Sequence, residues 1–249
     1  MASTLIVDQI QKTGGSTTAL TLPTSNASAS QYLQNDGAGA LSWATVASAG
    51  FIKYTVVTAT DTTFDLDSNT TKLVIEVQAS GGTAGSGHSS GYNGGSGGGG
   101  AYARKLLTGI TGSTDKLNIT IGAVAGVAAS GTTTSVAQAG TASFTTITCT
   151  GGAGGATAGG SSQGDGGAGG TLPTTGDFNI AGGGGMSGAV GHSNTAGGSW
   201  MSYPNGRMVD SGGIGMVPIG YGGGGNAAYS GSHAGGAGGP AVVIVWEYA

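Results

Sequence analysis

Few side chains of this sequence could take part in acid–base, nucleophilic or metal chemistry. The three histidines, His88, His192 and His233, all lie among glycines and small polar residues. A histidine that acts as a base must be positioned by a second group, so we expect these to face solvent or pack in loops. With one cysteine, Cys149, the chain can form no internal disulfide and cannot assemble three or four Cys or His ligands. Histidines from three copies of the chain could meet on a metal ion, but the sequence favours no metal site.

The remaining reactive types are equally scattered. The acidic residues show no spacing typical of a catalytic carboxylate pair, and Asp61, Asp65 and Asp67 are better explained as turn residues. Cys149 ends the strand-like run Phe144-Thr-Thr-Ile-Thr-Cys, which predicts a buried structural thiol.

Two glycine motifs resemble catalytic or cofactor signatures. Gly164-Asp-Gly-Gly-Ala-Gly169 satisfies G-x-G-x-x-G, but no strand precedes it, and Leu172-Pro173 follows where a helix should begin. Gly94-Gly-Ser-Gly-Gly98 satisfies G-x-S-x-G without the strand and helix that a nucleophile elbow requires. We therefore predict no catalytic residues, no cofactor and no enzymatic activity.

The elements that could position side chains are β-strands. Lys116–Ile121 alternates, with Leu117, Ile119 and Ile121 on one face. Similar patterns predict strands at 51–58, 63–66, 72–78, 103–107, 142–150 and 241–248. Because no stretch repeats its apolar residues every 3.6 positions, we expect almost no α-helix. About seven strands predict a mainly β fold with a small antiparallel β-sandwich.

Residues 1–50 form a separate segment. Leu5, Val7 and Ile10 mark a short β-like start, and Asp36-Gly37 between apolar runs predicts a hairpin. A segment of this size is too small to own a core, so we expect it to bury its apolar residues against copies of itself. The predicted domains are thus 1–50, for attachment and trimerisation, and 51–249.

Glycine accounts for 56 residues, concentrated in two blocks at 81–100 and 151–240 that are framed by strands. Because strands frame both blocks, we expect the glycines to be an ordered part of the fold. Extended left-handed helices with three residues per turn have no internal hydrogen bonds, so their backbone groups must pair with neighbouring helices. Glycine lets such helices approach closely. We therefore predict a polyglycine II-like bundle inserted into the sandwich.

Charge excludes some partners. Charged residues make up 7% of the chain, its net charge is −4, and its few basic residues are scattered. Nucleic acid binding needs clustered Lys and Arg, so we predict none. The apolar run at 241–248 is too short to cross a bilayer, so we predict no membrane insertion.

Bulky side chains interrupt the second glycine block. A glycine lattice cannot enclose them, so they should lie at loop tips or rims, where aromatic residues can serve as binding hot spots and stack on sugar rings. The turn Pro204-Asn-Gly206 would expose its neighbours. The candidate receptor-binding residues are Met186, Trp200, Met201, Tyr203, Arg207 and Tyr221. Local packing is the alternative role for the aromatic ones.

Two stretches resemble bacteriophage fibre proteins. The first is Leu20-Thr-Leu-Pro-Thr-Ser25 with Gln31-Tyr-Leu-Gln-Asn-Asp-Gly-Ala-Gly-Ala-Leu-Ser-Trp43, similar to a module of phage tail fibres, in which Ser30 replaces the usual glycine. The second covers about residues 70–248. It runs from Leu73-Val-Ile-Glu-Val-Gln-Ala79 through both glycine blocks to Gly238-Gly-Pro-Ala-Val-Val-Ile-Val245, and it resembles the glycine-rich domain of phage tail tips and receptor-binding proteins.

This resemblance implies a virion fibre protein, made in the host cytoplasm, that forms a homotrimer. Its N-terminal segment would attach to other virion proteins through Leu5, Val7 and Ile10. Its distal loops would contact a host cell-surface glycan or outer-membrane protein. The alternative within the virion is a capsid head fibre or decoration protein without dedicated receptor binding. An ice-binding protein would need regular G-x-x spacing, and a polysaccharide-degrading tailspike would need a carboxylate pair in a groove.

Overall fold

The computed structural model describes residues 9–10, 20–29, 31–36, 40–45, 50–124, 126–141, 143–189, 195–203, 213–229 and 231–249. Within these ranges the regular elements are strands, and none of the ranges contains a helix that could cross a bilayer. The mainly β, nearly helix-free fold predicted from the sequence is confirmed. Contacts divide the chain into two units, Met1–Ala49 and Gly50–Ala249.

Unit 1 contains two short antiparallel pairs. β1 (Gln9–Ile10) pairs with β2 (Leu20–Thr21), and β3 (Gln31–Asn35) pairs with β4 (Leu41–Thr45) in the register of the predicted hairpin. The indole Nε1 of Trp43 donates a hydrogen bond to the Ser25 carbonyl at 2.6 Å. No side chain described in this unit is buried, and Tyr32 is 48% exposed. Unit 1 thus shows a hairpin without a core.

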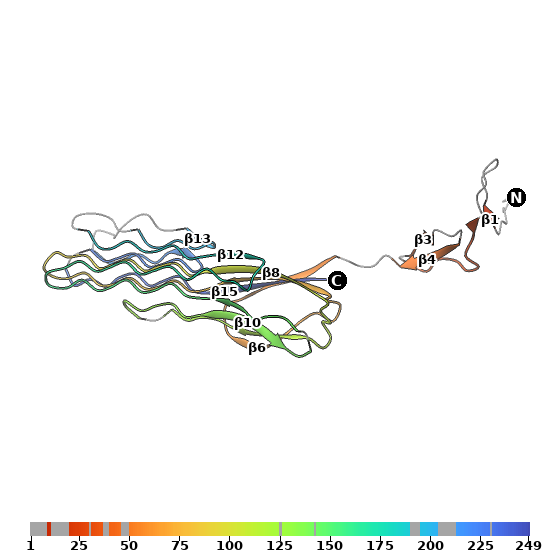
Figure 1. Cartoon of the computed structure of the whole chain (residues 1–249), viewed down its shortest axis with the longest axis horizontal. Helices are drawn as coiled ribbons and strands as arrows, with labels where there is room; N and C mark the ends of the chain where they lie inside the picture. The colour runs from red at the N-terminus through yellow and green to blue at the C-terminus, as the bar shows by residue number, and fades with distance from the viewer. Residues whose placement is uncertain are drawn as a thin grey trace. The chain divides into compact units, whose positions relative to one another are not determined.

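Unit 2 is built on two antiparallel sheets, seen as separate layers in Figure 1. The five-stranded sheet has the order β12-β8-β7-β15-β5 and the four-stranded sheet the order β11-β10-β9-β6. The strands of the first are β5 (Phe51–Val57), β7 (Lys72–Gln78), β8 (Tyr102–Thr108), β12 (Phe178–Ile180) and β15 (Val242–Tyr248). Those of the second are β6 (Asp61–Asp65), β9 (Lys116–Thr120), β10 (Thr134–Ala139) and β11 (Ile147–Cys149). A short pair, β13 (Ser202–Tyr203) with β14 (Ile219–Gly220), lies outside both sheets.

The core lies between the two sheets. Leu73, Ile75 and Val77 alternate on β7 and are fully buried, and they belong to one cluster with Leu117 and Ile119 of β9. This is the face that alternation in the sequence predicts. Because successive strand residues point to opposite sides, Val74 and Glu76 lie on the other face of the five-stranded sheet, which we call the outer face.

Several predicted strand bounds are wrong. The strand expected at 142–150 begins only at Ile147, because β10 occupies the position beside β9 and the preceding residues form its connection. β10 (Thr-Ser-Val-Ala-Gln-Ala) was not predicted, since its small polar residues have little strand propensity. β12 was not predicted either; it lies within the second glycine block and pairs with β8 at the sheet edge.

Extended glycine-rich segments run side by side from one end of the five-stranded sheet (Figure 1). Residues 93–101 lie at the centre of this glycine bundle. The segment that accepts from each N–H group changes in a cycle of three residues. The N–H groups of residues 95, 98 and 101 donate to the carbonyls of 156, 153 and 150. Those of 96 and 99 donate to 186 and 183, and those of 97 and 100 donate to 225 and 222. A cycle of three matches a helix with three residues per turn and no internal hydrogen bonds. This hydrogen-bond pattern is the one expected of the predicted polyglycine II-like bundle.

Six segments surround the central one, and each is hydrogen-bonded to it and to the next around the ring. In ring order they are 79–87, 151–158, 164–170, 181–188, 195–199 and 222–229. A further segment, 234–240, binds the outside of this ring, since the N–H groups of Gly81 and Ala84 donate to Gly239 and Gly236. Ordering glycine is costly in backbone entropy. The hydrogen bonds between segments satisfy backbone N–H and C=O groups that would otherwise bind water, and they offset that cost.

The bundle excludes side chains at most glycine positions. A Cβ atom at Gly98 would lie 2.5 Å from the carbonyl carbon of Ala168 and 2.9 Å from the Gly167 oxygen, whereas carbon contacts prefer about 3.5–4.0 Å. At Gly184, on the bundle surface, the nearest atom would be 3.8 Å away. The large side chains of this region therefore lie at the surface or beside the sheet.

Candidate functional site

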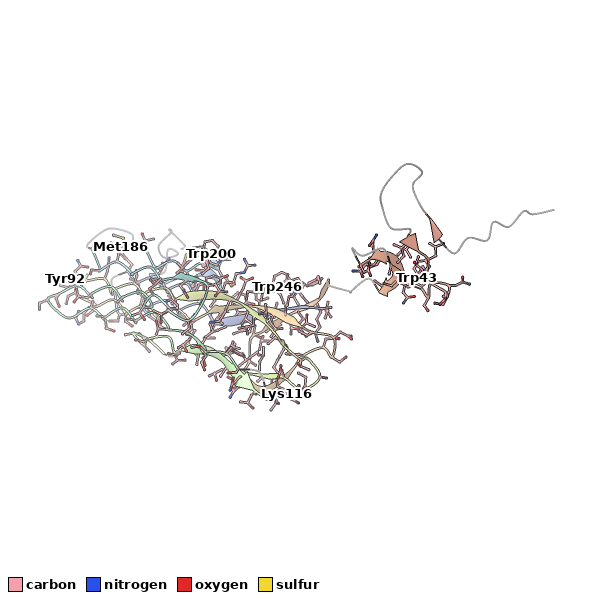
Figure 2. All side chains as sticks on the ribbon, turned by 45° about the vertical axis from the view of Figure 1, so that its right-hand side comes forward. Trp43, Tyr92, Lys116, Met186, Trp200 and Trp246 are labelled. Carbon is pink, nitrogen blue, oxygen red and sulfur yellow. The ribbon has the colours of Figure 1, made fainter. Side chains whose placement is uncertain are left out.

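Three aromatic rings form a cluster where the glycine bundle meets the five-stranded sheet. Tyr102 of β8 is buried, and its ring centroid lies 5.8 Å from that of Trp200 and 6.2 Å from that of Phe178. Phe178 and Trp200 are 5.7 Å apart in an edge-to-face arrangement. Trp200 is 57% exposed, so its indole lies on the molecular surface, supported from below by two rings. We call these three residues the aromatic platform, and Figure 2 labels Trp200.

Gln78 positions the turn that bears Trp200. It is the last residue of β7 and is fully buried. Its Nε2 donates to the carbonyls of Ala79, Gly100 and Ala101, and its Oε1 accepts the N–H of Met201 at 3.4 Å. One side chain thus joins the sheet, the central bundle segment and the residue next to Trp200.

A second polar residue orders the outer face. Glu76 Oε2 accepts a hydrogen bond from the Tyr102 hydroxyl at 2.7 Å, and its Oε1 accepts one from Trp246 Nε1 at 3.0 Å. Burial, then the hydrogen bond to the Glu76 carboxylate, raises the pKa of Tyr102 above its ordinary value. The phenol therefore stays protonated and holds the platform ring in one orientation.

A hollow of about 300 Å³ lies next to Phe178 on the outer face. Its walls are Val74, Leu106 and Phe178, with Arg104 and Asp177 as charged members. This volume is at the lower limit of small-ligand sites, and an apolar floor with a few polar groups is their usual composition.

The edge of this hollow is held by the segment before β12. Asp177 Oδ2 accepts the N–H of Leu106 at 2.8 Å, and the Asp177 N–H donates to the Arg104 carbonyl. Lys105 Nζ donates to the Thr175 carbonyl at 2.9 Å. These bonds attach β12 to β8, so Phe178 is set in place by strand pairing.

The predicted binding residues do not form one cluster. Trp200 and Met201 share a turn, and the Tyr221 N–H donates to the Met201 carbonyl. Met201 and Tyr221 are half-buried. Met186 is exposed, but it pairs with Thr195 further along the bundle. At about 3.1 Å per residue that is on the order of 15 Å from Trp200, and Figure 2 shows the two labels apart.

Other predicted residues fall partly or wholly outside the described ranges. Arg207 lies outside them, as do Leu5 and Val7. For Tyr203 and Ile10 only the backbone is described: Tyr203 pairs with Ile219, and Ile10 pairs with Leu20. Their roles stay predictions.

The residues considered for chemistry are not members of the platform. Ser96, of the G-x-S-x-G match, is buried in the central bundle segment, and its Oγ accepts the Ala227 N–H at 3.3 Å. Cys149 is buried as predicted, and burial raises the pKa of its thiol to about 12. Within the described ranges no three His, Cys, Asp or Glu residues gather as metal ligands.

Sequence reasoning missed Tyr102, Gln78, Arg104 and Asp177 as members of the site. Gln78 had a usable signal, since it is a polar residue that ends an apolar alternation and directly precedes glycine. Asp177 had none, because its bond to Leu106 joins residues 71 apart in the chain.

No family model matches this chain, and no curated protein matches it.

Proposed function

We propose that this chain is a structural fibre protein of a phage virion that binds a receptor on the host cell surface. The aromatic platform and the adjoining hollow would make the contact. The observation that carries the proposal is Trp200, a large aromatic side chain left more than half exposed by a framework that holds it in place. The sequence resemblance to phage fibre proteins supports the same function.

The chemistry of the site favours a glycan as the receptor. Exposed indole and phenyl rings offer flat apolar faces on which sugar rings stack. Arg104 and Asp177 stand at the edge of the hollow, where they can exchange hydrogen bonds with sugar hydroxyls or charged substituents. Because the rings are already ordered by Gln78 and Glu76, binding would lose little side-chain entropy.

The bundle suits a fibre tip. Its backbone is cross-linked in every direction by hydrogen bonds, while side chains are confined to its surface and ends. Several copies on one particle would add avidity to a weak single site without new contacts.

Binding to host cells tests the receptor role. The fluorescently labelled full-length protein is titrated onto cells of the bacterium that the phage infects, as wild type and as Trp200→Ala and Phe178→Ala. Loss of a hot-spot aromatic costs about 2 kcal/mol or more, so we expect affinity to fall roughly 30-fold. Leu172→Ala, at an exposed apolar position that belongs to neither the platform nor the hollow, is the matched control and should bind like wild type. Folded Trp200→Ala protein that binds like wild type would exclude the platform as the contact.

Position on the particle tests the fibre role separately. Immunogold labelling of intact virions with an antibody against residues 180–220 should mark the tail end. Label on the capsid would instead identify a head fibre, and the absence of label from every particle would refute the virion assignment.

A further inference from the structure

A second group of aromatic residues lies at the opposite edge of the five-stranded sheet from the platform. Phe51 and Tyr54 of β5 pack on Trp246 and Tyr248 of β15, with ring centroids 5.2–6.2 Å apart. Phe51 is 55% exposed, Tyr54 57% and, on the same strand, Val56 44%. The strand register places these five residues, which we call the aromatic strip, on the outer face; Figure 2 labels Trp246.

Charge is sparse along the strip: none of its five residues is charged, and the exposed Lys72 of β7 pairs with Tyr248 at one end of it. β5 is a seven-residue edge strand that, within the described ranges, pairs on one side with β15. Edge strands are usually protected by exposed charges. The one charged residue of β5, Lys53, points to the other face of the strand, where its Nζ lies 3.3 Å from Glu247. Glu76, the nearest acid on the outer face, has its carboxylate bound by Tyr102 and Trp246.

The area of the strip indicates part of a protein–protein contact. An aromatic side chain can bury about 150–250 Å², so two half-exposed rings with Val56 and the partly exposed Trp246 and Tyr248 leave on the order of 300–400 Å² of apolar surface. That equals a large apolar patch for a monomer. A stable interface buries about 800 Å² on each partner, so the strip would supply about half of one.

Unit 1 can supply a further contact between copies. Its β3–β4 hairpin leaves Tyr32 and Leu33 exposed and buries none of its described side chains, and an isolated two-stranded hairpin is marginally stable at best. Only five residues lie between Thr45 and Phe51, and each extends the chain by no more than about 3.6 Å. Copies joined through unit 1 would therefore hold their strips at a high effective concentration.

We propose that the aromatic strip is the contact between copies of this chain in unit 2, and that unit 1 makes a separate contact between the same copies. The contact residues are Phe51, Tyr54, Val56, Trp246 and Tyr248. This inference does not depend on the phage assignment or on receptor binding, because it concerns the oligomer in solution.

Molar mass tests the proposal first. The full-length protein is measured by sedimentation velocity across a wide concentration range, as wild type and as Tyr54→Glu. We expect a wild-type oligomer, and at least a tenfold rise in the dissociation constant for Tyr54→Glu, because a charge would have to be buried. Leu172→Glu, at an equally exposed position elsewhere, should keep the wild-type mass. Circular dichroism at each concentration confirms that the variants are folded.

Cross-linking gives a second readout. Cys149 is the only cysteine and is buried, so Val56→Cys introduces the one accessible thiol. A bifunctional maleimide should link Val56→Cys chains into dimers and leave Leu172→Cys chains single. A wild-type protein that is monomeric throughout, or an oligomer unchanged by Tyr54→Glu and not linked through Val56→Cys, would overturn the proposal. If the wild type is monomeric and Tyr54→Glu loses host-cell binding, the strip is instead a receptor contact.

Discussion

Replacing Gly98 by alanine adds one methyl group at the centre of the glycine bundle. The new Cβ would lie 2.5 Å from the carbonyl carbon of Ala168, so the neighbouring segment must move by about 1 Å to restore ordinary contact. That movement strains the hydrogen bonds of Gly98, which donates to the Ala153 carbonyl and accepts from the Gly82 N–H.

The expected loss can be estimated from these contacts. Overpacking costs about 1–3 kcal/mol, and weakening two hydrogen bonds costs about 0.5–1.5 kcal/mol each. Alanine also restricts the unfolded chain, which by itself raises the free energy of unfolding by about 0.4–1 kcal/mol. The free energy of unfolding should therefore fall by about 3 kcal/mol. For a unit of this size the melting temperature should fall by roughly 6–12 °C.

Gly184→Ala is the matched control. It makes the same change in the unfolded chain, but its methyl group would meet its nearest atom at 3.8 Å on the bundle surface. We expect its stability to be unchanged or raised by up to about 1 kcal/mol. Thermal unfolding followed by circular dichroism at one protein concentration compares the two variants. Gly98→Ala within about 1 kcal/mol of Gly184→Ala would refute the argument that close backbone approach makes glycine necessary at the bundle centre.

Three further outcomes follow from buried polar groups. Glu247 is fully buried and accepts hydrogen bonds from the Asp67 N–H and Thr70 Oγ1. Glu247→Ala should therefore lower the free energy of unfolding, measured by chemical denaturation, by about 3 kcal/mol. Lys53→Met removes only the half-exposed amine that pairs with Glu247, and it should lower the free energy of unfolding by under about 1 kcal/mol. Gln78→Met leaves three carbonyls and one N–H without their partner; it should cost about 2–3 kcal/mol and speed amide exchange at Met201, and unchanged exchange there would contradict the positioning role. Burial raises the pKa of Cys149 from 9.0 to about 12, so its contribution is complete below pH 9 and is lost as the pH rises toward 12. Cys149→Val should therefore flatten the fall of the melting temperature above pH 9, and an identical slope would show that the thiol contributes nothing to it.

Much of the sandwich was predictable because its strands have clear alternation. β7 and β9 agree with their predicted ranges to within a residue, and Leu73, Ile75 and Leu117 face the core as expected. β10 escaped prediction because its burial comes from being covered by two neighbours, while its own residues are small and polar.

The candidate site was only partly predictable. Trp200 was identified because a large aromatic residue within a glycine block has few buried places to occupy. Its neighbours Tyr102 and Phe178 come from β8 and from β12, a short strand that was not predicted from the sequence. The contacts among them depend on β12 pairing with β8, which no local pattern indicates.

Local patterns in the sequence determined which residues form strands, which face of each strand is apolar, and where glycine forms extended segments, because these properties depend on side chains a few positions apart. Only the tertiary structure decided which segment lies at the bundle centre and which six surround it. Glycine has no side chain to distinguish one neighbour from another, so that choice comes from the strands at the bundle's base. The same strand order places the aromatic platform and the aromatic strip at opposite edges of one sheet.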